Sequence, residues 1–307
     1  MPHSEGTIQF IADRGDTRLR LDQVLVRRIR DVSRLSRTAA QQWIASGAVT
    51  VNGVEAPRPS VRVREGAAIE VTLPSTATLR ARPSPEDAAL DVLYEDDVLL
   101  VVNKPAGVVV HPSYKQSAGT LLNAVLGRVR DRAGARPGIL TRLDKDTSGL
   151  VVIALTAPVH AAMQRDVAAG RVLKEYLAVV RGTPRPRNGR ITLALARDPN
   201  DRRRMIASPG GMPSETIYEV NTSSRTSVSR TSVVRCELVT GRTHQIRVHL
   251  ASCGWPVVGD SVYGTPSVAI ARQALHAWRI SLPHPVSRDP LTIEAPVPAD
   301  MRALIAE

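Results

Sequence analysis

The alternation of hydrophobic and polar positions defines a short module near the start of the chain. The segment SRTAAQQWIAS (36–46) has the composition of a helix, with its first serine as N-cap and Gly47 just past its end. Apolar and polar residues then alternate in AVTVNG, whose final Asn-Gly pair predicts a tight hairpin turn. A further strand, AIEVTLP, follows. We therefore expect residues 17–74 to form a small α/β domain, preceded by a tail over residues 1–16.

A second, larger domain follows a change in composition. Residues 75–88 are rich in Pro, Ser and Thr and show no periodicity, which is typical of a linker. Within residues 89–307, GLVVIALT (149–156) predicts a buried strand, the next segment predicts a helix that ends at Gly170, and VLKEYLAVVRG (172–182) predicts another strand. Strands and helices do not alternate regularly. We therefore expect an α+β fold with a mixed, largely antiparallel sheet, rather than a doubly wound one.

The charge balance indicates an anionic partner. The 307 residues carry 41 Lys and Arg against 29 Asp and Glu, a formal net charge of +12, and nearly all of the basic residues are arginines. Arginine suits RNA because its planar guanidinium grips phosphates and stacks on bases. A genomic preference for arginine would account for the ratio of Arg to Lys, but it accounts less well for the excess of positive charge. RNA is the partner that we expect.

The motifs of several enzyme classes are missing from the sequence. It has no phosphate-binding loop, dinucleotide-binding glycine pattern or nucleophile elbow, and its two cysteines lack metal-ligand spacing. His244 and His249 are not spaced as a zinc pair on a helix or a strand. We therefore expect no cofactor and no metal. The first residues lack the pattern of a secretory signal, and no apolar run reaches the roughly 18 residues of a membrane helix. We expect a cytoplasmic protein without membrane contacts, and nothing indicates an obligate oligomer.

A polar stretch just before the buried strand is the first candidate for chemistry. GILTRLDKDTSGLVVIAL (138–155) crowds charged and hydroxyl residues into a loop. Its two carboxylates, Asp144 and Asp146, are candidates for nucleophilic or acid–base work. Spacing alone does not choose between them, and a charged turn with internal ion pairs is the alternative.

A second polar stretch is ELVTGRTHQIRVHLASCG (237–254). Polar and apolar residues alternate between Gln245 and Leu250, as expected where a sheet face lines a cleft. Arg247 would there pair with a carboxylate and orient it. In KEYLAVVRG, Tyr176 offers an aromatic face for stacking a base, or it packs in the core.

At these residues the sequence resembles the RluA-type pseudouridine synthases, over nearly the whole second domain. RLDKDTSGL (142–150), KEYLAVVRG (174–182) and GRTHQIRVHLA (241–251) are similar to the three motifs of that family and stand in the same order. The resemblance implies the pseudouridine synthase fold. It also implies an isomerase that converts uridine in structured RNA to pseudouridine.

The resemblance further implies roles for individual residues. Asp144 is then the catalytic carboxylate, Tyr176 packs against the target base, and Arg247 pairs with Asp144 and keeps it ionised. Arg142 would fill the space left when the nucleotide leaves its helix, since chemistry on a base in structured RNA requires extrusion. Family members usually have His where this chain has Thr141, a position that we interpret as supporting.

The first domain resembles the alpha-L RNA-binding domain of ribosomal proteins and RNA-modifying enzymes. RLDQVL (20–25), the SRTAAQQWI helix and GAVTVNG (47–53) carry this resemblance. Family members with this extra domain commonly act on large ribosomal RNA, which is the substrate that the resemblance implies here. The alternative is a non-catalytic RNA-binding or ribosome-assembly protein that retains the fold. The expected phosphate contacts are arginines of this domain that we expect to be exposed: Arg27, Arg28, Arg30, Arg34 and Arg37.

Overall fold

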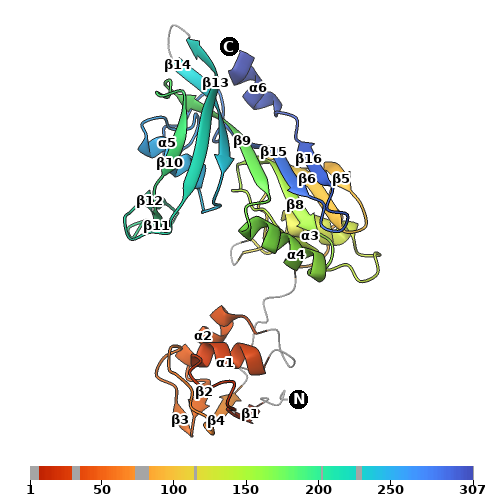
Figure 1. Ribbon diagram of the computed structural model, residues 1–307, viewed down its shortest axis with the longest axis vertical. Helices are drawn as coiled ribbons and strands as arrows, with labels where there is room; N and C mark the ends of the chain where they lie inside the picture. Colours follow the sequence, from red (N-terminus) through yellow and green to blue (C-terminus); the bar gives the residue numbers. More distant parts are fainter. Residues whose placement is uncertain are drawn as a thin grey trace. The chain divides into compact units, whose positions relative to one another are not determined.

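The chain folds into two compact units, coloured red to orange and yellow to blue in Figure 1. The first unit spans Met1–Arg82 and the second spans Pro83–Glu307. Within the described part of the chain, no helix is long and apolar enough to cross a membrane. The computed structural model describes residues 7–29, 35–72, 83–113, 116–201, 203–225 and 230–306.

The described part of the first unit consists of a small antiparallel sheet and two helices. Its elements are β1 (Thr7–Ile11), α1 (Leu21–Arg28), α2 (Arg37–Ala45), β2 (Val49–Val51), β3 (Val54–Glu55) and β4 (Ala68–Thr72). The strands lie in the order β1-β4-β2-β3. The helices pack on the sheet through a core that buries Leu21, Leu25, Ile44 and Ile69.

Local signals in the first unit act as the sequence predicts. α2 begins after Ser36, whose side chain accepts a hydrogen bond from the amide of Ala39 at 3.2 Å. Gly47, just past the helix, has a φ of +76°, which glycine adopts without strain. β2 and β3 form the predicted hairpin around Asn52 and Gly53, both of which have positive φ.

The prediction that the chain begins with a tail over residues 1–16 is wrong for residues 7–11. Residues 7–11 form β1, which pairs with β4 along its whole length, from Thr7 opposite Thr72 to Ile11 opposite Ala68. The partner strand lies about sixty positions further along the chain, so no short-range pattern reveals the pairing. The first unit therefore includes part of the segment that composition assigned to a tail.

A mixed sheet forms the frame of the second unit. Its strands, counted over the described residues, are β5 (Val92–Glu95), β6 (Leu99–Lys104), β7 (Gly138–Ile139), β8 (Ser148–Ala154), β9 (Leu173–Arg181), β10 (Asn188–Thr192), β13 (Glu215–Arg225), β14 (Arg230–Leu238), β15 (Leu275–Pro283) and β16 (Pro290–Glu294). The order is β10-β13-β14-β9-β15-β8-β6-β5, with β16 beside β15 and β7 beside β8. Only the β8–β15 pair is parallel among these described strands, so the predicted fold class is confirmed.

Helices and a separate hairpin complete the second unit. They are α3 (Leu121–Arg128), α4 (Ala157–Ala168), β11 (Leu195–Arg197), β12 (Met205–Ala207), α5 (Gln245–Ser252) and α6 (Ala299–Ala306). Alternate residues of β6 and β8 face two separate cores. Val102 and Val151 face the core shared with α3, whereas Val101 and Val152 face the larger core shared with α4. Because both faces of β8 are covered, all of its residues are buried, as predicted for this strand.

The predicted linker over residues 75–88 is too long at its end. Asn123 of α3 donates from Nδ2 to the carbonyl of Ser84 at 2.8 Å, and its own carbonyl accepts from the amide of Glu86 at 3.0 Å. The second unit therefore begins at residue 83. These contacts depend on a partner some forty positions away, which composition does not show. The other residues of that linker up to position 82 lie outside the described residues.

A close approach of two strands fixes the loop before β8. Gly149 has a φ of +112°, and a Cβ added there would lie 2.2 Å from the carbonyl oxygen of Ala277 on β15. Only glycine therefore allows β8 and β15 to pair at this point. The loop over residues 140–147, which joins β7 to β8 and carries Asp144, is thereby held beside β15.

Candidate active site

A cavity of about 440 Å³ opens in the second unit at the loop before β8. Its walls come from this loop, from β9 and from the segment before α5. Three of the predicted site residues, Arg142, Asp144 and Tyr176, line it together, and His111 and Lys174 lie beside them. Titratable side chains that converge on one cavity are typical of an active site.

Behind Asp144, a buried arginine joins two carboxylates. Arg247 of α5 donates from Nη1 to Oδ2 of Asp144 at 2.8 Å. It also donates from Nε and Nη2 to the two oxygens of Asp260, at 2.7 and 2.9 Å. The side chains of Arg247 and Asp260 are 6% and 0% exposed. The structure thus brings together the predicted pair of Asp144 and Arg247. Oδ1 of Asp144 forms no hydrogen bond with any described residue, so it is the oxygen left for a ligand.

Burial and pairing have opposite effects on the pKa values of Arg247 and Asp260. Burial lowers the pKa of Arg247, but the hydrogen bonds and charges of Asp260 and Asp144 outweigh burial and raise it above its ordinary value. Burial likewise raises the pKa of Asp260, but Arg247 and the amides of Val262 and Tyr263 lower it overall. Arg247 and Asp260 therefore stay charged at neutral pH, and Arg247 presents its remaining donor to Asp144.

The segment that carries Arg247 is a helix, not the predicted strand. α5 starts directly after His244, which has a φ of +55°. Gln245, Arg247 and His249 are buried as deeply as their apolar neighbours, and the side chain of each forms a hydrogen bond with a residue outside the helix. Because each of these side chains has a hydrogen-bond partner inside the protein for at least one of its polar atoms, the polar and apolar alternation does not separate exposed from buried positions. That alternation led to the wrong prediction.

A buried lysine holds the loop that carries the candidate carboxylate. Lys104, at the end of β6, is fully buried, and its ammonium donates to the carbonyls of Pro105, Val108 and Lys145 at 2.7, 2.8 and 2.9 Å. Burial lowers the pKa of Lys104 to about 8. The ammonium thus cross-links the end of β6 to the loop one residue after Asp144.

Thr141, which replaces the expected histidine, fastens the other end of the same loop. Its hydroxyl accepts a hydrogen bond from the amide of Val152 on β8 at 3.0 Å. The amide of Leu140 donates to the carbonyl of Val152 at 2.8 Å. Thr141 therefore holds the chain against β8, and its side chain also lines the cavity.

β9 contributes a buried phenol and a half-buried cation to the cavity. Burial and the charge of Asp144 raise the pKa of Tyr176, so its hydroxyl stays protonated. Lys174 is half-buried in the cavity wall, and its ammonium forms no hydrogen bond or ion pair with any described residue. Burial lowers its pKa. A half-buried cation without a counter-ion is costly, so its position favours an anionic ligand.

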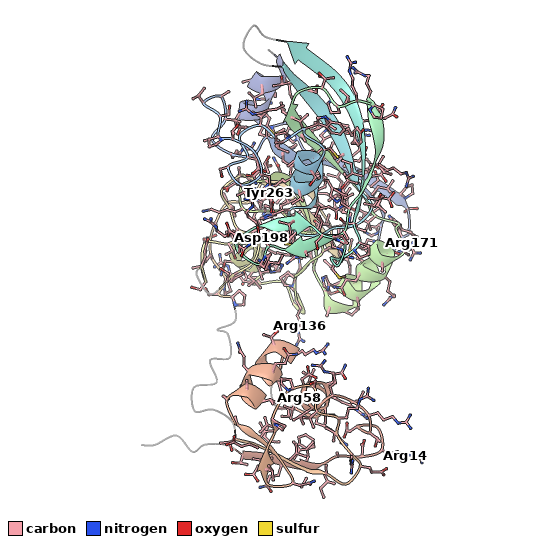
Figure 2. The ribbon with its side chains drawn as sticks, turned by 90° about the vertical axis from the view of Figure 1, so that its left-hand side faces the viewer. Arg14, Arg58, Arg136, Arg171, Asp198 and Tyr263 are labelled. Carbon is pink, nitrogen blue, oxygen red and sulfur yellow. The ribbon has the colours of Figure 1, made fainter. Side chains whose placement is uncertain are left out.

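Three residues that sequence reasoning missed surround Asp144 and Arg247. Nε2 of His244 lies 3.7 Å from Oδ2 of Asp144, and Nδ1 of His244 lies 2.8 Å from the hydroxyl of Tyr263. Figure 2 labels Tyr263 in the second unit. Asp260 is the third. His244 lies inside the third sequence motif, which was a usable signal. Asp260 and Tyr263 lie in GDSVYG, where no pattern predicts a site.

Comparison with known families identifies the fold. Residues 98–252 match the family model described as RNA pseudouridylate synthase, and residues 19–69 match the S4 domain. The chain belongs to the RNA pseudouridylate synthase family. The resemblance found in the sequence is thereby confirmed for both units, and the protein is an isomerase that forms pseudouridine in RNA.

Relatives of this pseudouridine synthase cover most of its length. Ribosomal large subunit pseudouridine synthase D of Neisseria meningitidis (serogroup B) is 41% identical over 302 residues, which are 94% of this chain and 78% of the relative. The RNA pseudouridine synthase YlyB of Bacillus subtilis is 38% identical over 275 residues, 88% of each chain. Among solved structures, human RNA pseudouridylate synthase domain containing 1 aligns with a TM-score of 0.56 and 28% identity, over 69% of this chain and 84% of that chain.

In the first unit of the synthase, the three predicted phosphate contacts that the structure describes are paired with buried carboxylates. Arg27 pairs with Asp16 and Arg37 pairs with Asp22, and both arginines remain half exposed. Arg28 pairs with Asp16 as well and is only 29% exposed, so its predicted exposure is wrong. The paired arginines are therefore held in place at the surface rather than free in solvent. Two further predicted contacts lie outside the described residues: Arg30 and Arg34.

Proposed function

We propose that this synthase isomerises specific uridines of large-subunit ribosomal RNA, with Asp144 as its essential carboxylate. The geometry of Asp144 carries the proposal. Arg247 holds Oδ2 at 2.8 Å, Oδ1 is unpaired among the described residues, and the side chain lines a cavity of about 440 Å³. The relatives named as ribosomal large subunit synthases, together with the S4 domain, support ribosomal RNA as the substrate. A ribosomal substrate in turn favours a cytoplasmic enzyme.

The central requirement of the reaction is a carboxylate oxygen next to the ribose. The bond between C1′ of ribose and N1 of uracil breaks, the base turns, and C1′ is joined to C5. C5 loses a proton and N1 gains one, so the atoms and electrons balance without an oxidant or a second substrate. The carboxylate acts either by attack on C1′ or by removal of the proton from C2′. Both routes use Oδ1 of Asp144, while Arg247 holds the other oxygen.

The remaining cavity residues fit the demands of a nucleotide that has left its helix. The ring of Tyr176 offers a face on which the detached uracil stacks. Lys174 supplies the positive charge for a phosphate of the same strand. Arg142 is exposed at the cavity and is placed to fill the gap that the extruded nucleotide leaves.

Release of tritium from carbon 5 tests this function directly. Large-subunit ribosomal RNA labelled at carbon 5 of uridine is incubated with the enzyme in the presence of a chelator. We expect tritium release, with slower release from transfer RNA and small-subunit RNA. Shortened RNA would instead indicate a nuclease, and retained binding without release would indicate a non-catalytic RNA-binding protein. Preferred release from transfer RNA would contradict the ribosomal substrate but not the activity.

A further inference from the structure

The conformation of His244 is one that proteins seldom use without a reason. A φ of +55° places this residue in the left-handed region, directly before α5. Histidine tolerates this region better than most residues do, but the conformation is uncommon outside glycine and asparagine, and it tends to occur at functional sites. It directs the imidazole between Asp144 and Tyr263, with Nε2 3.7 Å from Oδ2 of Asp144.

The partners of Tyr263 determine which nitrogen of His244 carries the proton. The amide of Met205 donates to the hydroxyl oxygen of Tyr263 at 2.8 Å, and that hydroxyl lies 2.8 Å from Nδ1 of His244. Burial raises the pKa of Tyr263, so the phenol keeps its proton, and with Met205 donating to its oxygen the hydroxyl is placed to donate a hydrogen bond to Nδ1. Burial also lowers the pKa of His244, which favours the neutral ring. A neutral imidazole that accepts at Nδ1 carries its proton on Nε2, the nitrogen that faces Asp144.

Tyr263 is itself fixed by the buried ion pair. Its amide donates to Oδ1 of Asp260 at 3.1 Å, and the guanidinium of Arg247 lies 5.0 Å from the centre of its ring. Asp144, Arg247, Asp260, Tyr263 and His244 therefore form a closed circuit of contacts. Four of its five links are hydrogen bonds, and the fifth, from His244 to Asp144, is at 3.7 Å too long to be one.

We propose that His244 is a positioning residue, which donates from Nε2 to Oδ2 of Asp144 when RNA is bound, and that Tyr263 selects the tautomer able to do so. The inference rests on the proposed role of Asp144. Hydrogen bonds at active sites are often long in the free enzyme and shorten in the complex. With Arg247 and His244 both donating to Oδ2, the carboxylate cannot rotate, and Oδ1 remains directed at the nucleotide.

Nitrogen-15 NMR of the full-length, histidine-labelled enzyme reads the tautomer without any assay of activity. The chain has seven histidines, and the signal that is lost in His244→Asn identifies the ring of interest. Asparagine also tolerates the left-handed region, so this variant keeps the local backbone. We expect wild-type His244 to be protonated on Nε2, and Tyr263→Phe to give a mixture of tautomers. Protonation of the wild-type ring on Nδ1 would overturn the proposal.

Single-turnover rates then test the positioning role. We expect Tyr263→Phe and His244→Asn to slow tritium release by about 10- to 100-fold while the Kd for RNA changes less than about twofold. His244→Gln should recover part of the rate, because its amide nitrogen reaches the position of Nε2. A full rate in Tyr263→Phe and His244→Asn would contradict the proposal. Should His244→Asn fail to fold, the loss of a signal in His244→Gln assigns the ring in the NMR spectrum, and Tyr263→Phe still tests the proposal.

The two proposals fail in different ways. If Asp144→Asn is inactive and both positioning variants are fully active, only the role of His244 falls. If Asp144→Asn itself releases tritium at the wild-type rate, the proposed function of Asp144 falls, whatever the tautomer of His244.

Discussion

The ion pairs that hold the arginines of the first unit and the ion pair that holds Asp144 in the second unit bury opposite members. In the first unit, the carboxylates of Asp16 and Asp22 are completely buried, and the arginines that they bind remain partly exposed. In the second unit, Arg247 is buried and binds Asp144, which is 24% exposed, on one side and the fully buried Asp260 on the other. A buried charge must be paired in either case. The exposed member of each pair determines the charge available to a ligand, which is positive around Asp16 and Asp22 in the first unit and negative at Asp144 in the cavity.

This contrast suits the two tasks that we propose for the two centres, RNA binding and catalysis. Arginines held by buried carboxylates have fewer rotamers to lose when they meet a phosphate. A carboxylate held by a buried arginine keeps one oxygen fixed and leaves the other available. We therefore expect variants of the second centre to abolish chemistry, and variants of the first centre to weaken RNA binding with little effect on the chemical step.

Arg247→Met should have the largest effect on stability. It leaves Asp144 and Asp260 without their counter-charge, and removing one partner of a buried pair costs about 3–5 kcal/mol. Denaturant unfolding measures the loss. Arg235→Met is the matched control, because Arg235 also joins two carboxylates, Glu175 and Glu219, but is 40% exposed. That variant should lose no more than about 1 kcal/mol per pair. Equal losses in the two variants would contradict the account.

Asp22→Asn should destabilise the first unit by about 2–3 kcal/mol, since hydrogen bonds to a charged group are the stronger ones. Asp22 accepts from Arg20, Arg37 and Gln41, all of which would lose their charged acceptor. Hydrogen exchange in peptides of α1 and α2 measures the stability within the full chain. RNA affinity should fall, while the single-turnover rate at saturating RNA should stay near that of wild type. Glu65→Gln, at an exposed site in the same unit, is the control. An equal loss of RNA affinity in Glu65→Gln would contradict the role of Asp22 in holding the arginines.

The contribution of Asp22 should disappear in acid. Burial raises its pKa, but hydrogen bonds from Gln41, Arg37 and Arg20 outweigh burial and lower the pKa from 3.8 to about 2. A carboxyl whose folded pKa is depressed stabilises the fold above the unfolded value and loses that stabilisation as the pH falls through the folded value. The loss amounts to roughly 2 kcal/mol between about pH 5 and pH 2. The stability difference between wild type and Asp22→Asn should therefore shrink over this range, and a constant difference would contradict the assignment.

The sequence predicted elements whose signals are local. The cap at Ser36, the turn at Asn52 and the buried run of β8 depend on neighbouring residues, and the structure agrees with each. β1 and α5 were missed for a common physical reason. The pairing of β1 and the buried polar side chains of α5 depend on partners far away in the sequence, which no periodicity reports.

The candidate site was predictable only where a motif marked it. Asp144, Tyr176 and Arg142 meet in one cavity, and Arg247 lies behind them as the motifs imply. Asp260, which fixes Arg247 with two hydrogen bonds, has no motif of its own. A carboxylate that acts through an arginine rather than on the substrate is visible only once the fold brings the two together.

The choice between the two carboxylates of the loop tests the central claim most directly. Asp144 is paired with Arg247 at the cavity, whereas no described residue binds the side chain of Asp146. Tritium release in a single turnover, measured with RNA affinity, should show Asp144→Asn slowed by more than about 10³-fold with RNA still bound, and Asp146→Asn within about threefold of wild type. Tritium release by Asp144→Asn at a rate close to wild type would contradict the account.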